Sequence, residues 1–238
     1  YQPLTNNSVY TKDTTTSVRG YPYQEVQTPM YVVSRTRGSN GIGGISTNTY
    51  QYGGKKHHHL AGESLGFRWI QVTDPAGLIH ATYNNQDREN ALDGTVARNE
   101  VYVPSGVRIK YSASTWTRAN GVCGGTPQAV LTSSVEQNRE LDGSVYSTVN
   151  TTNTHDSCGF PTTTVIDHGG GNIRTVVNQY IHDTATWRLG QLMRTDVTNE
   201  APNQTPQTRT STFSYNALGL IEQEVIEPGN TALAVTTT

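Results

Sequence analysis

The fold of this chain is decided by the stretch Thr47-Asn-Thr-Tyr50-Gln-Tyr52-Gly-Gly54, then a polar loop, then Leu65-Gly66-Phe67-Arg68-Trp69-Ile-Gln-Val-Thr73-Asp74-Pro75-Ala-Gly77-Leu-Ile-His-Ala-Thr-Tyr83. It predicts one strand, a loop and then a hairpin. Asp at the first turn position, Pro at the second and Gly at the fourth are preferences of a type I turn, which places a turn at Asp74–Gly77. The aromatic residues Phe67 and Trp69 suit a half-buried strand before that turn.

Turn signals divide the rest of the chain at strand-length intervals. From Met30 onward, strand-like runs alternate with turn signals about every 8–15 residues, the spacing of all-β proteins. Tyr outnumbers Phe by 13 to 3, and Thr is abundant, which favours strands over helical bundles. We therefore predict an all-β fold of consecutive antiparallel hairpins over residues 30–238, after a polar lead-in over residues 1–29. One short helical turn is expected at Asp87–Asp93.

The composition excludes several classes of function. A formal net charge of -2 gives no excess of positive charge that would indicate binding to nucleic acid or to an anionic membrane surface. No run of about 18 apolar residues is present, so we expect no transmembrane helix. No signal peptide is visible, and the chain begins with Tyr1 and ends within a strand-like pattern. We expect it to be a piece of a longer polypeptide.

The deciding stretch also resembles a known family through the order of its aromatic, glycine and arginine residues. The pattern is Y-x-Y-G-G, then L-G-F-R-W, then V-T-D-P-x-G. Its residues are Tyr50, Tyr52, Leu65, Gly66, Phe67, Arg68, Trp69, Asp74, Pro75 and Gly77. It resembles the Rhs/YD-repeat proteins, in particular the segment of bacterial toxin-complex (Tc) B components and related secreted proteins that leads into the Rhs shell.

A second stretch resembles one YD repeat, whose usual pattern begins Y-x-Y-D-x-x-G-R-L. Residues 212–229 place Tyr215 and Gly219 at matching positions. Asn216 stands where the family has Asp, and Leu220 stands where it often has Arg. The repeats in this chain are therefore degenerate.

The resemblance implies a structural role without catalysis. In the resembled family, consecutive hairpins form a hollow shell that encloses a toxic C-terminal effector. The partners would then be the remainder of the same polypeptide and the enclosed effector, in a protein secreted by bacteria or held at their surface. No cofactor, nucleic acid or membrane span is implied. A shell cut open leaves strand edges with unpaired backbone groups, so self-association through these edges is also expected.

Two other classes of function stay open. Sheets that bear Tyr and Trp beside Asn/Gly loops can hold sugars, which suits an extracellular adhesion or glycan-binding module. A hydrolase is the second alternative, because Gly62–Gly66 matches G-x-S-x-G with Ser64 as the nucleophile. That motif needs a strand before the serine and a helix after it, whereas a Lys/His loop over residues 55–59 precedes Ser64 and a strand follows. We predict a structural loop there and no catalytic residue.

The other motifs have structural explanations. His57–His59 suggests a metal site, but adjacent residues on a strand point to opposite faces, so we expect a solvated loop without metal. Asp74 lies in a D-P-x-G-L element, which resembles the one that supplies a self-cleavage aspartate in complete Rhs proteins. A paired-carboxylate protease needs a second aspartate close by, so we predict a turn. Gly38–Gly44 lacks the G-x-G-x-x-G spacing of a nucleotide-binding loop.

Cys123 and Cys158 both lie in loops that contain Gly and Pro. Two cysteines in such settings form a disulfide if the chain is exported, and they stay free thiols if it is not. The sequence leaves both alternatives open, and nothing near either cysteine suggests a Cys/His catalytic pair.

Overall fold

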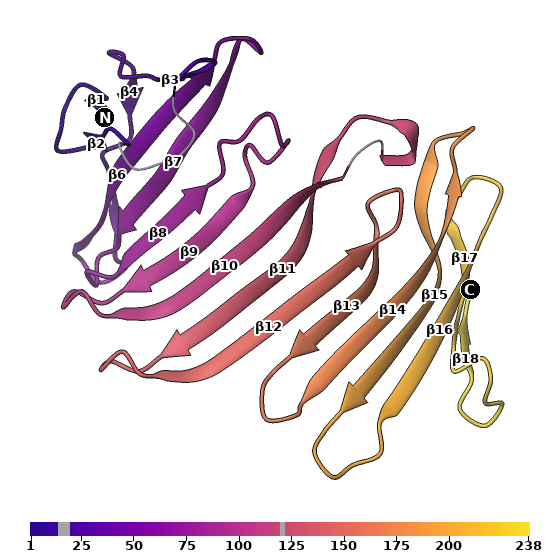
Figure 1. Cartoon of the computed structure of the whole chain (residues 1–238). Helices are drawn as coiled ribbons and strands as arrows, with labels where there is room; N and C mark the ends of the chain where they lie inside the picture. Colours follow the sequence, from indigo (N-terminus) through magenta and orange to yellow (C-terminus); the bar gives the residue numbers. More distant parts are fainter. Residues whose placement is uncertain (14–19, 120–121) are drawn as a thin grey trace. The chain divides into compact units, whose positions relative to one another are not determined.

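The computed structural model describes residues 1–13, 20–119 and 122–238, and their regular secondary structure is almost entirely β-strand (Figure 1). In chain order the strands are β1 (Gln2–Pro3), β2 (Tyr10–Thr11), β3 (Tyr23–Glu25), β4 (Tyr31–Val32), β5 (Arg35–Ser39), β6 (Ile45–His58), β7 (Glu63–Thr73), β8 (Ile79–Asn84), β9 (Val96–Tyr102), β10 (Arg108–Ala119), β11 (Gln128–Arg139), β12 (Val145–His155), β13 (Pro161–Asp167), β14 (Ile173–Asp183), β15 (Arg188–Glu200), β16 (Gln207–Tyr215), β17 (Ile221–Ile226) and β18 (Val235–Thr237). A short 3-10 helix, η1 (Val122–Gly124), lies between β10 and β11. None of the helices in the described ranges is long and apolar enough to cross a bilayer.

Strand order follows the chain, which confirms the predicted all-β fold of consecutive antiparallel hairpins. From β6 to β18, each strand is the neighbour of the next in the sheet. The ladders from β6 to β10 and from β12 to β18 are antiparallel, whereas β2 pairs with β6 in parallel. The predicted helical turn at Asp87–Asp93 is wrong, because hydrogen-bonded turns occupy this segment. The Asp87 side chain accepts the Asn90 N–H at 3.1 Å, which offers the backbone an alternative to a helix.

The chain divides into two compact units by its internal contacts. The first unit comprises Tyr1–Trp116 and Glu136–Tyr146, and the second comprises Thr117–Val135 and Ser147–Thr238. Strands β1 to β9 lie within the first unit and β13 to β18 within the second. A domain boundary at residue 30 remains a prediction.

The first unit has a small apolar core to which its N-terminal residues contribute. The core residues are Leu4, Val9, Tyr10, Val32 and Tyr52. Backbone hydrogen bonds hold this segment in place, since the Leu4 N–H donates to the Met30 carbonyl at 2.9 Å and the Tyr52 N–H donates to the Val9 carbonyl at 2.8 Å. The residues expected as a polar lead-in therefore supply three members of the core.

The second unit is a sheet with little apolar burial. Val130 and Cys158 are its buried hydrophobic residues among those described. Along β13 every side chain is half-buried, and β14 alternates between half-buried and exposed positions. Cross-strand pairs such as Val176 with Val197, and the 2.8 Å hydrogen bond between the Thr198 and Thr208 hydroxyls, stabilise the ladder instead.

One turn geometry recurs at five hairpins across the two units. In each, the first residue's carbonyl accepts the N–H of a glycine three residues on, and its N–H donates to the carbonyl of the fifth residue. The five turns are Asp74–Leu78, Val103–Val107, Glu140–Ser144, Asp156–Phe160 and Asn216–Leu220. Their glycines have φ between +79° and +89°, a conformation that costs glycine nothing. The turn predicted at Asp74–Gly77 is one of the five.

Three of these turns are closed by the side chain of their first residue. The side-chain Oδ1 accepts the N–H groups two and four residues further along the chain, at 2.8–3.1 Å, in the turns that begin at Asp74, Asp156 and Asn216. An Asp or Asn followed by Gly three residues later is therefore the local signal for a hairpin in this chain. This signal predicted the turn at Asp74, whereas no turn was predicted from it at Asp156.

Replacing a turn glycine tests this geometry with a matched control. An added Cβ meets nothing within 4 Å at Gly106 (φ +87°) or at Gly38, whose φ lies outside the left-handed region. Gly106→Ala is expected to lower the free energy of unfolding by about 1–2 kcal/mol, because an L-residue is strained at positive φ. Gly38→Ala is expected to be nearly neutral. Equal effects of the two substitutions in urea unfolding would show that backbone strain is not the cause.

Candidate functional site

Two glycines of the Y-x-Y-G-G motif make room for two side chains of the L-G-F-R-W motif. Gly53 pairs with Trp69 across β6 and β7. A Cβ on Gly53 would lie 2.1 Å from the Trp69 indole. Gly54 (φ +61°) makes room for Arg68 in the same way, because a Cβ added to Gly54 would lie 2.9 Å from the Arg68 Cβ. The two motifs are thus the two halves of one packing arrangement.

The aromatic residues of these motifs complete the apolar core. The Tyr52 and Phe67 ring centroids lie 4.8 Å apart, and Phe67 also meets the edge of Tyr10. The Tyr52 hydroxyl donates to the Val33 carbonyl at 2.9 Å, so its polar end is satisfied. Leu65 is buried, and Tyr50 packs against the core from β6. These positions stabilise the fold.

The segment expected as a solvated Lys/His loop is instead the buried end of β6, so that prediction is wrong. Lys55 and Lys56 are 8% and 2% exposed. Lys56 Nζ lies 3.7 Å from the Asp13 carboxylate, and Arg68 Nε lies 3.2 Å from the same group. Burial lowers the pKa of Lys56, while Asp13 and Glu25 oppose this shift. The N-terminal segment therefore supplies the acidic partners that permit lysine burial.

Tyr10 joins this polar cluster to the core. Its hydroxyl donates to Glu25 Oε1 at 2.6 Å and accepts the Lys55 N–H at 2.9 Å. Burial, followed by the hydrogen bond to Glu25, raises the pKa of Tyr10 well above its usual value. The hydroxyl consequently stays protonated and acts as a fixed donor.

The His57–His59 run lies at the end of β6 and just after it. His58 is buried, with Nδ1 accepting the Ala61 N–H at 3.0 Å and Nε2 lying 3.3 Å from Glu89 Oε1. The rings of His57 and His59 lie 5.5 Å apart, edge to face. Within the ranges that the structure describes, no group of three potential ligands includes any of these histidines.

Ser64 lies within β7 and is exposed, so a strand replaces the sharp turn that a nucleophile elbow requires. Its Oγ accepts hydrogen bonds from Lys55 Nζ at 2.9 Å and from the Gly66 N–H at 3.4 Å. Burial lowers the pKa of Lys55. This lysine–serine contact was not predicted from the sequence, because it depends on the pairing register of β6 and β7.

The other predicted positions are turn and strand residues. Asp74 Oδ2 lies 3.3 Å from His80 Nε2, and its Oδ1 accepts the turn N–H groups, so this carboxylate is engaged within its own hairpin. Pro75 occupies the second turn position of that hairpin. The Tyr215 hydroxyl donates to the Leu192 carbonyl at 3.0 Å, and Gly219 (φ +82°) ends a recurring turn.

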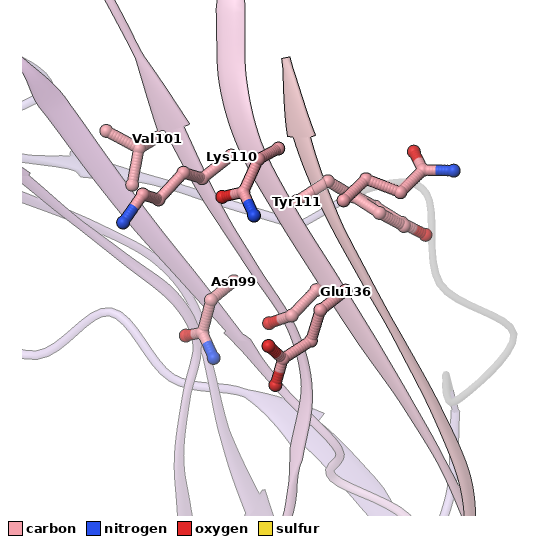
Figure 2. Close-up of a pocket in the computed structure, with 8 residues that line it drawn as sticks. Asn99, Val101, Lys110, Tyr111 and Glu136 are labelled. Atoms are coloured by element: carbon pink, nitrogen blue, oxygen red, sulfur yellow. The ribbon is translucent and has the colours of Figure 1, made fainter. Parts of the chain in front are cut away.

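A hollow of about 250 Å³ lies over β9, β10 and β11 within the first unit. Figure 2 shows the side chains of Asn99, Lys110 and Glu136 pointing to one side of the sheet, and Tyr111 pointing away from them. Its lining residues are Asn99, Val101, Lys110, Tyr111, Ser112, Glu136, Gln137 and Asn138. The hollow is thus an open, polar surface of amides, a hydroxyl and both signs of charge. None of its residues was predicted as a site.

The opposite face of the same strands carries a charged cluster. Glu100 is buried, and its carboxylate accepts from Arg108 Nη1 at 2.6 Å and lies 3.7 Å from Arg98 Nε. The two guanidinium groups lie over the rings of Tyr83 and Tyr111, at 3.9 and 4.4 Å from the ring centroids. The charged groups of this face are therefore paired with one another or stacked on tyrosine rings.

Cys123 and Cys158 form a disulfide in the second unit, with their Cα atoms 4.6 Å apart. It links η1 to the turn between β12 and β13. His182 on β14 lies beside this disulfide.

Comparison with known proteins supports a single architecture. No family model matches the sequence, and no curated protein matches it. A chain of the crystal structure of TcdB2-TccC3-Cdc42 matches with a TM-score of 0.63 and 11% identity, over 83% of this chain and 16% of that chain. TcdB2-TccC3 without its hypervariable C-terminal region (TM-score 0.58, 11% identity) and the Photorhabdus luminescens Tc holotoxin pore (TM-score 0.58, 10% identity) each match over 76% of this chain and 15% of theirs.

This chain shares its fold with Tc toxin chains. It spans less than a fifth of the length of the Tc toxin chains that it matches. The expected resemblance to Tc components is therefore supported at the level of the fold, and the assignment of YD repeats remains a prediction.

The packing of Trp69 on Gly53 gives a second test. Gly53→Ala is expected to destabilise the chain by about 1–3 kcal/mol, because the new methyl group would overlap the indole. In a Trp69→Leu background the same substitution is expected to cost clearly less, since the overlap is removed. A double-mutant cycle by urea unfolding measures the coupling, and purely additive effects would contradict the proposed packing.

Proposed function

We propose that this chain is a non-catalytic structural part of an Rhs/Tc-toxin-like β-shell that encloses a toxic C-terminal effector. The observation that carries the proposal is the uninterrupted run of sequential hairpins, which matches Tc toxin chains over 83% of this chain. The partners are then the remainder of the same polypeptide and its enclosed effector. The protein is bacterial, and it is secreted or held at the cell surface.

The exposure and polarity of the side chains on the strands of the second unit support an enclosing role. Its strands keep half-buried and exposed side chains on both faces, and Thr, Asn and Gln are frequent among them. These polar groups keep the surface wetted beside exposed apolar side chains such as Val177, Ile181 and Met193, so it can border a cargo without binding it tightly. A hydrophobic lining would instead retain an unfolded chain.

Protease protection of the effector tests enclosure in the complete polypeptide. The segment that follows this chain is expected to resist proteolysis in the intact protein and to become sensitive in Val176→Pro. The proline removes a backbone donor in β14, a strand with a neighbour on each side. Val176→Thr is the matched control and should keep the protection. A downstream segment that is digested equally fast in all three proteins would contradict the proposal.

The absence of catalysis has its own test at Ser64. A fluorophosphonate probe is expected to leave Ser64 unlabelled, because a lysine contact on an exposed strand supplies no means to orient an acyl group. Ser64→Ala and Lys55→Met serve as controls in the same mass-spectrometric assay. Stoichiometric labelling of Ser64 that is lost in Lys55→Met would establish a hydrolase instead.

The hollow over β9–β11 favours a second candidate function, an extracellular adhesion or glycan-binding module. Its amides, hydroxyl and charged groups can hydrogen-bond sugar hydroxyls. Binding of the chain on a glycan array, abolished by Asn99→Ala and by Lys110→Ala, would support this candidate. Binding that neither substitution changes would place any glycan site elsewhere.

A further inference from the structure

The disulfide of the second unit lies within a cluster of metal-ligating groups. The sulfurs of Cys123 and Cys158 and one ring nitrogen of His182 all lie within 4.8 Å of one another. Cys158 is the third residue of the recurring turn at Asp156–Phe160, and His182 lies on β14. The cluster thus combines three elements that are far apart in sequence.

Hydrogen bonds fix the protonation of His182. The Gly190 N–H donates to His182 Nδ1 at 3.1 Å, so Nδ1 carries a lone pair and no proton. The proton of the neutral ring then resides on Nε2, which lies 2.9 Å from Asp156 Oδ2 and donates to it. A carboxylate that accepts from the non-coordinating nitrogen is the arrangement that orients histidine ligands of zinc.

Backbone contacts keep the two cysteines together independently of the disulfide. The Cys123 N–H donates to the Ser157 carbonyl at 3.0 Å, which docks η1 on the turn. Asp156 Oδ1 accepts the N–H groups of Cys158 and Phe160 at 2.8 and 3.0 Å, which holds the turn itself. None of these hydrogen bonds involves a sulfur atom.

We propose that reduction of the Cys123–Cys158 disulfide creates a Zn²⁺ site formed by both thiolates and His182 Nδ1, with Asp156 as the residue that positions the histidine. In a tetrahedral site the sulfurs need to separate to about 3.7 Å, given zinc–sulfur bonds of about 2.3 Å. The sulfurs are bonded to each other in the structure and move apart on reduction, and Nδ1 exchanges the Gly190 N–H for the metal. The fourth position is left for water.

The chemistry balances with an external thiol as the reductant. A dithiol attacks one sulfur, the disulfide bond breaks, and two cysteine thiols form while the dithiol becomes a disulfide. Binding of Zn²⁺ then releases one proton from each thiol. Two thiolates and an imidazole are a donor set that zinc favours over magnesium or calcium.

The surroundings suit a zinc–thiolate site. The Phe160 ring lies 5.4 Å from the His182 ring and 5.3 Å from the Tyr180 ring. Cys158 is 5% exposed. A Cβ on Gly190 would lie 2.1 Å from Phe160, so the glycine lets this ring pack closely over the neighbouring strand. Burial of Cys158 limits access of water to its sulfur, and charge interactions are stronger in such a setting.

Cobalt and zinc titrations of the whole chain, oxidised and reduced with a phosphine, test the proposal. The reduced protein is expected to bind one Co²⁺ with a thiolate-to-cobalt charge-transfer band, which Zn²⁺ displaces. Zn²⁺ should also raise its thermal midpoint. The oxidised protein is the internal control and should show neither effect. Absence of the band in the reduced protein would overturn the proposal.

Variants of His182 and Asp156 test whether these residues contribute to Zn²⁺ binding in addition to the two cysteine thiolates. His182→Gln is expected to weaken Zn²⁺ binding at least about 10-fold, and Asp156→Asn by about 10–100-fold. His168→Gln changes an exposed histidine in another turn and should bind as the wild type does. Each variant is first shown to match the wild-type thermal midpoint in its oxidised form, which excludes misfolding. Equal Zn²⁺ affinity of His182→Gln and wild type would refute the role of the histidine.

Discussion

The backbone hydrogen-bond ladder between sequential strands is the interaction on which this structure depends. The second unit buries only Val130 and Cys158 among its described apolar residues, so side-chain burial cannot supply most of its stability. Each strand instead gains stability from the neighbours with which it pairs and from cross-strand contacts such as Val176 with Val197. This dependence makes every hairpin turn structurally important, and it explains why one turn geometry is used five times.

A ladder of this kind leaves an exposed edge, and the first unit covers the edge at β6. Three short strands pair with β6: Tyr10–Thr11 in parallel, and Tyr23–Glu25 and Arg35–Ser39 in antiparallel fashion. The N-terminal residues also bring Asp13 and Glu25 close to the buried lysines. The same part of the chain therefore covers the edge of β6 and supplies the acidic partners of the lysines. Burial of Lys56 costs free energy that only such close acidic partners can offset.

Among the described residues, each unit has a glycine in close contact with an aromatic ring. Trp69 lies over Gly53 in the first unit, and Phe160 lies over Gly190 in the second. A ring above a strand glycine covers backbone that would otherwise face water, and it adds apolar contact where no second layer exists. In the second unit the same ring also packs against His182, at 5.4 Å between ring centroids, so one packing arrangement contributes to stability and to the proposed metal site.

The sequence by itself determined the local structure of this protein. Period-2 strands, turn glycines and the Asp or Asn at turn starts are encoded within about five residues of each other, which is why the all-β fold and the hairpin at Asp74–Gly77 were predictable. The order of the motifs also indicated a resemblance to Tc components, and this chain shares the fold of Tc toxin chains.

Only the tertiary structure decided which distant residues meet. Nothing local shows that Lys55 contacts Ser64, that Asp13 joins the buried lysines, or that His182 lies beside the disulfide. Each of these contacts depends on strand register, and a shift of one residue would turn the side chain to the other face of the sheet. Register is set jointly by several ladders and turns, so it becomes definite only when the whole sheet has formed.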